Sequence, residues 1–157
     1  MRRTTQARLA TLATLLLVQT AVFAHVTIAP RESASSVEQR YTVRVPTERD
    51  TPTVRIEAQF PGELFVVSID AKDGWRVETT AGADGRIVSA VWSGGRIAPH
   101  ESDAFTVVAR NPAREATVVW KVVQIHDDGS RAEWVGEQGS RNPAPITNIR
   151  AVGSTSP

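Results

Sequence analysis

Apolar and polar side chains alternate along much of this chain. The clearest run is Thr53–Phe60, in which Val54, Ile56, Ala58 and Phe60 fall on one side and polar residues on the other. An alternation of period two predicts a strand with one buried face. Similar runs bring the total to seven or eight predicted strands, at Tyr41–Val45, Phe65–Ala71, Trp75–Thr80, Arg86–Trp92, Phe105–Arg110, Ala116–Ile125 and Ala132–Val135.

Pairs of turn-forming residues separate these runs, at Pro61-Gly62, Asp84-Gly85, Gly94-Gly95, Asn111-Pro112 and Asp128-Gly129. The two Asp-Gly pairs predict hairpins. No segment after residue 24 shows a sustained helical period, so the fold class is all-β. Ala116–Ile125 is apolar on both faces, which predicts a central strand covered on both sides. This pattern favours an immunoglobulin-like two-sheet sandwich.

The first 24 residues have the three parts of an export signal. Three arginines precede an apolar stretch, Leu9–Val18, and small residues follow in Ala21-Val22-Phe23-Ala24. The apolar stretch is shorter than the roughly 20 residues of a membrane-spanning helix. We therefore predict a signal peptide over 1–24, a single domain over 25–152 and a disordered tail over 153–157. The product is expected to be exported, to a periplasm or outside the cell, without a membrane anchor.

Removal of this leader changes the net charge of the protein. The whole chain has 18 basic and 17 acidic residues. The leader contributes three arginines and no acid, so the mature chain has 15 basic and 17 acidic residues, a net charge of −2. Such a surface has no electrostatic footprint for nucleic acid. The chain also has no cysteine, which excludes thiolate metal sites, so any metal must be held by nitrogen and oxygen.

Cleavage after Ala24 would make His25 the first residue of the mature protein. The amine and the imidazole Nδ1 of one residue can then chelate a metal together. An α-amine has a pKa of about 7.7–8, low enough for Cu(II) to displace its proton near neutral pH. Copper heads the divalent affinity order and prefers a tetragonal N,O environment. The sequence therefore indicates Cu(II) as the bound metal, with a carboxylate as a natural third ligand beside the amine and the imidazole.

Four motifs in order resemble the YcnI-like family of secreted copper-binding domains. They are His25-Val26-Thr27-Ile28-Ala29-Pro30, the stretch from Ile97 through Pro99 and Glu101 to Asn111-Pro112, Asp128-Gly129-Ser130 with Glu133-Trp134, and Pro145-Ile146-Thr147-Asn148-Ile149. The resemblance covers essentially the whole mature chain. It implies an immunoglobulin-like sandwich that binds Cu(II) through a monohistidine brace, formed by the first residue, a glutamate and a nearby tryptophan.

Carried over by motif position, the metal-site residues are His25, Glu101 and Trp134, with no catalytic residue. His100 stands where the family tends to have glycine, and is a candidate extra ligand. Glu101 could instead be a solvated loop acid, and Trp134 a core aromatic like the other three tryptophans. His126, before the Asp128-Gly129 turn, is expected to be a solvated turn residue.

Three functions fit these features. The first is an exported, non-enzymatic protein that captures or carries copper, with a copper-transporting membrane protein or another carrier as its partner. A CopC-like carrier is a close variant, but its further ligands have no evident counterpart here. The second is a copper-dependent oxidative enzyme, which would need a second histidine in the brace. The third is a cell-surface interaction module without metal, because fold alone does not decide function.

Overall fold

The structure, a computed structural model, describes residues 25–151, and the predicted leader and the whole of the predicted tail lie outside them. The described residues form twelve β-strands and no helix. Accordingly, none of them belongs to a helix that could cross a membrane. The prediction of an all-β fold is confirmed.

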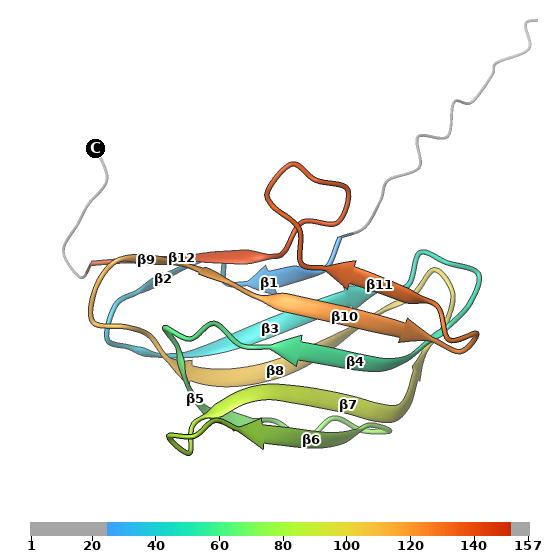
Figure 1. Cartoon of the computed structure of the whole chain (residues 1–157), viewed down its shortest axis with the longest axis horizontal. Coiled ribbons are helices and arrows are strands. Elements are labelled where there is room, and N and C mark those ends of the chain that lie inside the picture. Colours follow the sequence, from blue (N-terminus) through green and yellow to red (C-terminus); the bar gives the residue numbers. More distant parts are fainter. Residues whose placement is uncertain (1–24, 152–157) are drawn as a thin grey trace, which may run out of the picture.

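Nine of the strands form one hydrogen-bonded sheet that folds over into two facing layers (Figure 1). One layer contains β1 (Thr27–Ala29), β3 (Glu38–Pro46), β8 (Ser102–Arg110) and β5 (Phe65–Ile69). The other contains β6 (Arg76–Ala81), β7 (Ile87–Ile97), β4 (Thr53–Gln59), β10 (Lys121–His126) and β11 (Arg131–Trp134). Strand β5 joins the layers because it pairs with β8 along its length and with β7 at Val66.

A second, three-stranded sheet closes one side of the sandwich. It contains β2 (Glu32–Ala34), β12 (Ile146–Arg150) and β9 (Ala116–Val119), in that order. Strand β12 runs parallel to β2 and antiparallel to β9. The alternation pattern missed β1, β2 and β12. Each of these strands has only three to five residues, too few to display a period.

Aromatic side chains fill the space between the two layers. Trp92 of β7 meets Phe105 of β8 with ring centroids 5.1 Å apart, and Tyr41 of β3 meets Trp120 with centroids 5.0 Å apart. All four rings are almost fully buried. Offset aromatic pairs of this kind contribute beyond the area that they bury. The core therefore lies between the layers, as alternation in the sequence requires.

The prediction of a strand covered on both faces at Ala116–Ile125 is wrong. The strand breaks at Trp120, where β9 ends and β10 begins, and the chain passes from the small sheet to the large one. The Trp120 amide donates to the Pro145 carbonyl at 2.9 Å, and its Nε1 donates to Thr147 Oγ1 at 3.2 Å. Inward residues alternate with outward ones, and Val119 is exposed. The outward valines that suggested a second covered face lie at or near the surface.

The Gly94-Gly95 pair does not form a turn, contrary to prediction. Both glycines lie inside β7, where its pairing with β4 shifts register opposite Thr53 and Arg55. Gly94 has a φ of +82°, and a Cβ on Gly95 would lie 2.3 Å from the Trp75 ring. The glycines thus form a bulge that admits Trp75 over the strand. The two predicted Asp-Gly hairpins are confirmed, between β6 and β7 and between β10 and β11.

Candidate metal centre

His25 is an exposed residue two positions before β1, and its neighbours hold it in place. Val26 and Ile28 are buried, and β1 pairs with β3 from Thr27 opposite Arg44. Continued by two residues, this antiparallel register would set His25 opposite Pro46, the last residue of β3. The short first strand therefore directs His25 toward the segment that follows β3.

Trp134, at the end of β11, supplies one wall of the site. Its ring lies edge-on to the His25 ring, with centroids 5.5 Å apart and an interplanar angle of 89°. The side chain is 5% exposed, and Nε1 donates to Gln124 Oε1 at 2.6 Å. Gln124 in turn donates from Nε2 to the Pro46 carbonyl and to Thr53 Oγ1. Because this hydrogen-bonded chain fixes the indole, Trp134 is both a core residue and a neighbour of His25.

The carboxylate that the structure brings to His25 is Glu48, which sequence reasoning missed. Glu48 lies two residues after β3 and is half-buried, and its Oε1 is closed to solvent without a hydrogen-bond partner in residues 25–151. Burial raises the pKa of this carboxyl above 4.5, and the nearby charge of His25 lowers it in part. An unpaired buried carboxylate oxygen is costly and calls for a positive partner. Glu48 could have been found only by predicting a strand at residues 27–29 and pairing it with Tyr41–Val45, which brings the segment after Val45 to His25.

Glu101 lies on the exposed surface in the turn between β7 and β8. Its carbonyl accepts from the Thr47 amide at 2.8 Å, so its backbone is adjacent to the segment that carries Glu48. Its side chain makes no hydrogen bond or ion pair with the described residues. Glu101 therefore stays a prediction as a ligand, beside the better-placed Glu48.

His100 has a φ of +62°, in the left-handed region that favours glycine. This backbone conformation explains why glycine suits the position in the resembling family. The His100 ring is turned toward Asp50, with Nε2 and Oδ1 3.2 Å apart. The structure thus pairs His100 with Asp50, and no contact to His25 is seen among the described residues.

The expectation that His126 is a solvated turn residue is wrong. It is the last residue of β10 and is only 3% exposed. Its Nδ1 lies 3.1 Å from the Thr51 carbonyl, while its Nε2 is buried and has no hydrogen-bond partner in the part of the chain that the structure describes. The turn begins one residue later, at Asp127, so alternation along β10 directs His126 inward.

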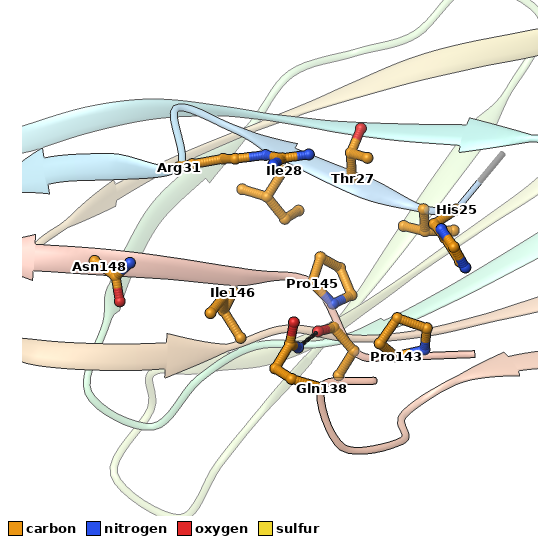
Figure 2. A pocket seen from close by; sticks show the side chains of 11 residues that line it. His25, Thr27, Ile28, Arg31, Gln138, Pro143, Pro145, Ile146 and Asn148 are labelled. Carbon is orange, nitrogen blue, oxygen red and sulfur yellow. Dashed lines mark hydrogen bonds between the residues drawn. The ribbon is translucent and has the colours of Figure 1, made fainter. Parts of the chain in front are cut away.

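Two hollows flank this group of residues. The first, of about 430 Å³, runs between β1 and the segment leading into β12, and Figure 2 shows His25 at one end of it, next to Pro143. Arg31 and Asn148 lie toward its other end (Figure 2). The second, of about 390 Å³, is lined by Glu48, Trp134 and His126, among others. His25 borders the first hollow and touches Trp134 of the second.

The nitrogen and oxygen donors at this site suit a small cation of hard or intermediate character in the hard–soft sense. The described residues include no cluster of three or more His, Cys, Asp or Glu side chains that could hold a metal. A site here therefore needs a further donor, and a free amine on His25 would supply it. With that amine, the imidazole and the Glu48 carboxylate, the set is two nitrogens and one oxygen, which fits Cu(II).

Comparison with known proteins places this geometry in context. The sequence matches the model of a family described as a domain of unknown function, DUF1775, over residues 25–149. It is also 34% identical over 131 residues to a Bacillus subtilis protein named copper-binding protein CutI. That alignment covers 82% of this chain and 64% of the relative, so the chain spans a little under two thirds of the relative's length.

Solved structures match the fold. A Nocardia farcinica protein, whose crystal structure reveals an immunoglobulin-like fold, is 25% identical with a TM-score of 0.69, over 80% of this chain and 98% of that one. A cohesin module from a Clostridium perfringens family 33 glycoside hydrolase is 16% identical with a TM-score of 0.52, over 81% and 96% of the two chains. The predicted immunoglobulin-like sandwich is thereby confirmed, and the cohesin likeness bears on the fold alone.

Proposed function

Since this chain belongs to the DUF1775 domain family, that of the YcnI-like proteins, we propose that it is an exported protein that binds Cu(II) at His25. Signal cleavage after Ala24 frees the His25 amine, and the amine and imidazole then chelate the ion. Glu48 supplies the carboxylate, and Trp134 covers one side of the site. The copper-binding relative supports the choice of metal.

One observation carries this proposal: the buried Glu48 Oε1 has no hydrogen-bond partner among the described residues, and it lies close enough to His25 for the two charges to interact. A half-buried carboxylate retained without a partner is costly to the folded protein. A cation bound between Glu48 and His25 removes that cost by supplying the missing charge.

The proposed role is capture or carriage of copper rather than catalysis. A brace that activates O₂ needs a second histidine at the ion, but His100 faces Asp50, and no contact between His126 and His25 is seen among the described residues. His25 is exposed, so a bound ion would be accessible to a second protein. We propose that a copper-transporting membrane protein or another carrier exchanges the ion, in a periplasm or outside the cell.

The test is Cu(II) titration of the chain beginning at His25, followed by electron paramagnetic resonance. We expect about one equivalent to bind, with nitrogen hyperfine structure, and His25→Ala to abolish this signal. The control is an N-terminal extension that ends in proline directly before His25. In this extended chain the nitrogen of His25 is an amide instead of an amine, and the proline has no amide proton of its own to lose, so the last residue of the extension adds no deprotonated nitrogen donor. Equal affinity in the extended chain would refute the brace.

The carboxylate is tested with a matched pair, Glu48→Gln and Glu101→Gln. Both substitutions remove one negative charge from neighbouring segments, but only Glu48 is buried beside His25. We expect Glu48→Gln to weaken Cu(II) binding by about 100-fold or more, a loss typical of substitutions at residues around a bound metal. Glu101→Gln should change the affinity little. The reverse result would restore Glu101 as the ligand.

A further inference from the structure

The second hollow has features that the copper site does not use. We name it the arginine pocket, after Arg49, Arg131 and Arg141, which line it together with Glu48, Gln124 and His126, among others. Its volume of about 390 Å³ lies within the range of small-molecule sites. It is bounded by β10, β11 and the segment after β3. It shares Glu48 and Trp134 with the proposed copper site, whereas the three arginines and His126 have no role there.

The protein neutralises the three arginines unequally. Arg131 has ion pairs with Glu57 and Glu133 at 3.5 Å each. Arg49 donates to Ser130 Oγ at 3.3 Å, and its charge acts on the Asp128 carboxylate. Arg141 has no hydrogen bond or ion pair with the described residues. Glu48 is the one acid that lines the pocket, so arginine outnumbers carboxylate three to one. Guanidinium groups bind carboxylates in a fork-like geometry, and this lining favours an anion.

His126 adds a hydrogen-bonding demand at the inner side of the pocket. A carbonyl can only accept, so the contact of Nδ1 with the Thr51 carbonyl places the ring proton on Nδ1. The Nε2 of the neutral ring then carries a lone pair, and no donor among the described residues reaches this buried atom. Buried polar atoms almost always have partners, and each exception needs an explanation. An O–H or N–H group of a bound molecule would satisfy this lone pair.

We propose that the arginine pocket binds a small 2-hydroxycarboxylate or its 2-amino counterpart. The carboxylate lies among Arg49, Arg131 and Arg141, and the adjacent hydroxyl or ammonium donates to His126 Nε2. The two halves of such a molecule match the two unmet features of the lining, its positive charge and its lone pair. A plain anion would meet only the first. The pocket adjoins the proposed copper site at Glu48 and Trp134, but the binding proposed here needs no metal.

The test is isothermal titration calorimetry of the metal-free protein with L-malate and with succinate, which differ by one hydroxyl group. We expect malate to bind at least about tenfold more tightly, because succinate leaves Nε2 unpaired. L-Aspartate replaces the hydroxyl by an ammonium and identifies which of the two donors the pocket prefers. Equal affinity for malate and succinate would overturn the proposal. So would binding of inorganic phosphate as tight as that of malate, or no binding of malate at millimolar concentration.

Two variants locate the site. Arg141→Gln is expected to weaken malate by about tenfold, whereas Arg114→Gln, an exposed arginine outside the pocket, leaves it unchanged. His126→Phe is expected to reduce the affinity for malate to that for succinate. Should that variant fail to fold, as judged by circular dichroism, the two-ligand comparison on the unmodified protein still decides. Equal effects of Arg141→Gln and Arg114→Gln would refute the assignment. The copper titration is independent, so failure of either proposal leaves the other standing.

Discussion

Two buried polar clusters lie near opposite ends of β3, and they differ in how completely their atoms are paired. At its start, Tyr41 donates to Asn111 Oδ1 at 2.5 Å, and Asn111 Nδ2 donates to Ser33 Oγ and the Ala34 carbonyl. Ser33 then donates to Gln39. Just beyond the other end, Glu48 Oε1 and His126 Nε2 are buried without partners. The first cluster stabilises the fold, whereas the second contains unpaired polar atoms that a ligand could pair with.

This difference follows from the free energy of buried polar groups. A satisfied network adds to stability, and an unsatisfied atom subtracts from it unless something binds there. Departures from full pairing in a native fold are therefore concentrated where the molecule does its work. The comparison predicts opposite effects for substitutions in the two clusters.

The largest effect is expected for Asn111→Ala. The substitution removes one hydrogen-bond partner each from the Tyr41 hydroxyl, Ser33 and the Ala34 carbonyl. We expect the free energy of unfolding to fall by about 3 kcal/mol, measured by urea denaturation. Copper affinity at the other end of β3 should not change. A stability close to that of the unmodified protein would show that this network is not structural.

Trp134→Phe is expected to have the next largest effect, and on both properties. Loss of the indole N–H leaves Gln124 Oε1 unpaired and buried, which should reduce the free energy of unfolding by about 1–2 kcal/mol. The ring facing His25 also shrinks, so the Cu(II) spectrum should shift even where affinity is retained. An unchanged spectrum with reduced stability would assign Trp134 to the core alone.

A smaller effect is expected from the titration of Tyr41 at high pH. Burial raises the pKa of its hydroxyl above 10.0, while the hydrogen bonds with Ser33 and Asn111 lower it in part. The unfolded chain then loses this proton at a lower pH than the folded protein does. Stability contributed by the protonated hydroxyl is therefore full below pH 10 and declines as pH rises above it.

Tyr41→Phe is the control for that titration. The variant should be less stable at neutral pH by about 1 kcal/mol, because it leaves Asn111 Oδ1 unpaired. Its stability relative to the unmodified protein should then improve above pH 10, as followed by thermal unfolding. Parallel curves for the two proteins across this range would contradict the assigned shift.

The smallest effect is expected for Glu48→Gln in metal-free protein. This substitution removes a carboxylate whose ionisation burial opposes, so stability at neutral pH should be equal or slightly higher. Thermal unfolding without and with Cu(II) measures both parts of the prediction, since bound metal raises the midpoint by mass action. A marked loss of stability without metal would place Glu48 in the same structural class as Asn111.

The sequence by itself determined the fold class and the strands longer than about five residues. In β4 and β8 the period-two pattern is set by which side chains must leave water, and that requirement is local. It also singled out His25 and Trp134, which the structure places with ring centroids 5.5 Å apart. Short strands such as β1 and the bulge at Gly94-Gly95 were not visible, because their conformations depend on the strands beside them.

Only the tertiary structure decided which polar groups share a site. Glu48 reaches His25 through the pairing of β1 with β3, and His126 turns inward because β10 continues one residue beyond its apolar run. Neither relation can be read from spacing along the chain, since both depend on register between strands distant in sequence. The identity of the donors is local chemistry, whereas their convergence, and the absence of partners for two of them, is a property of the assembled fold.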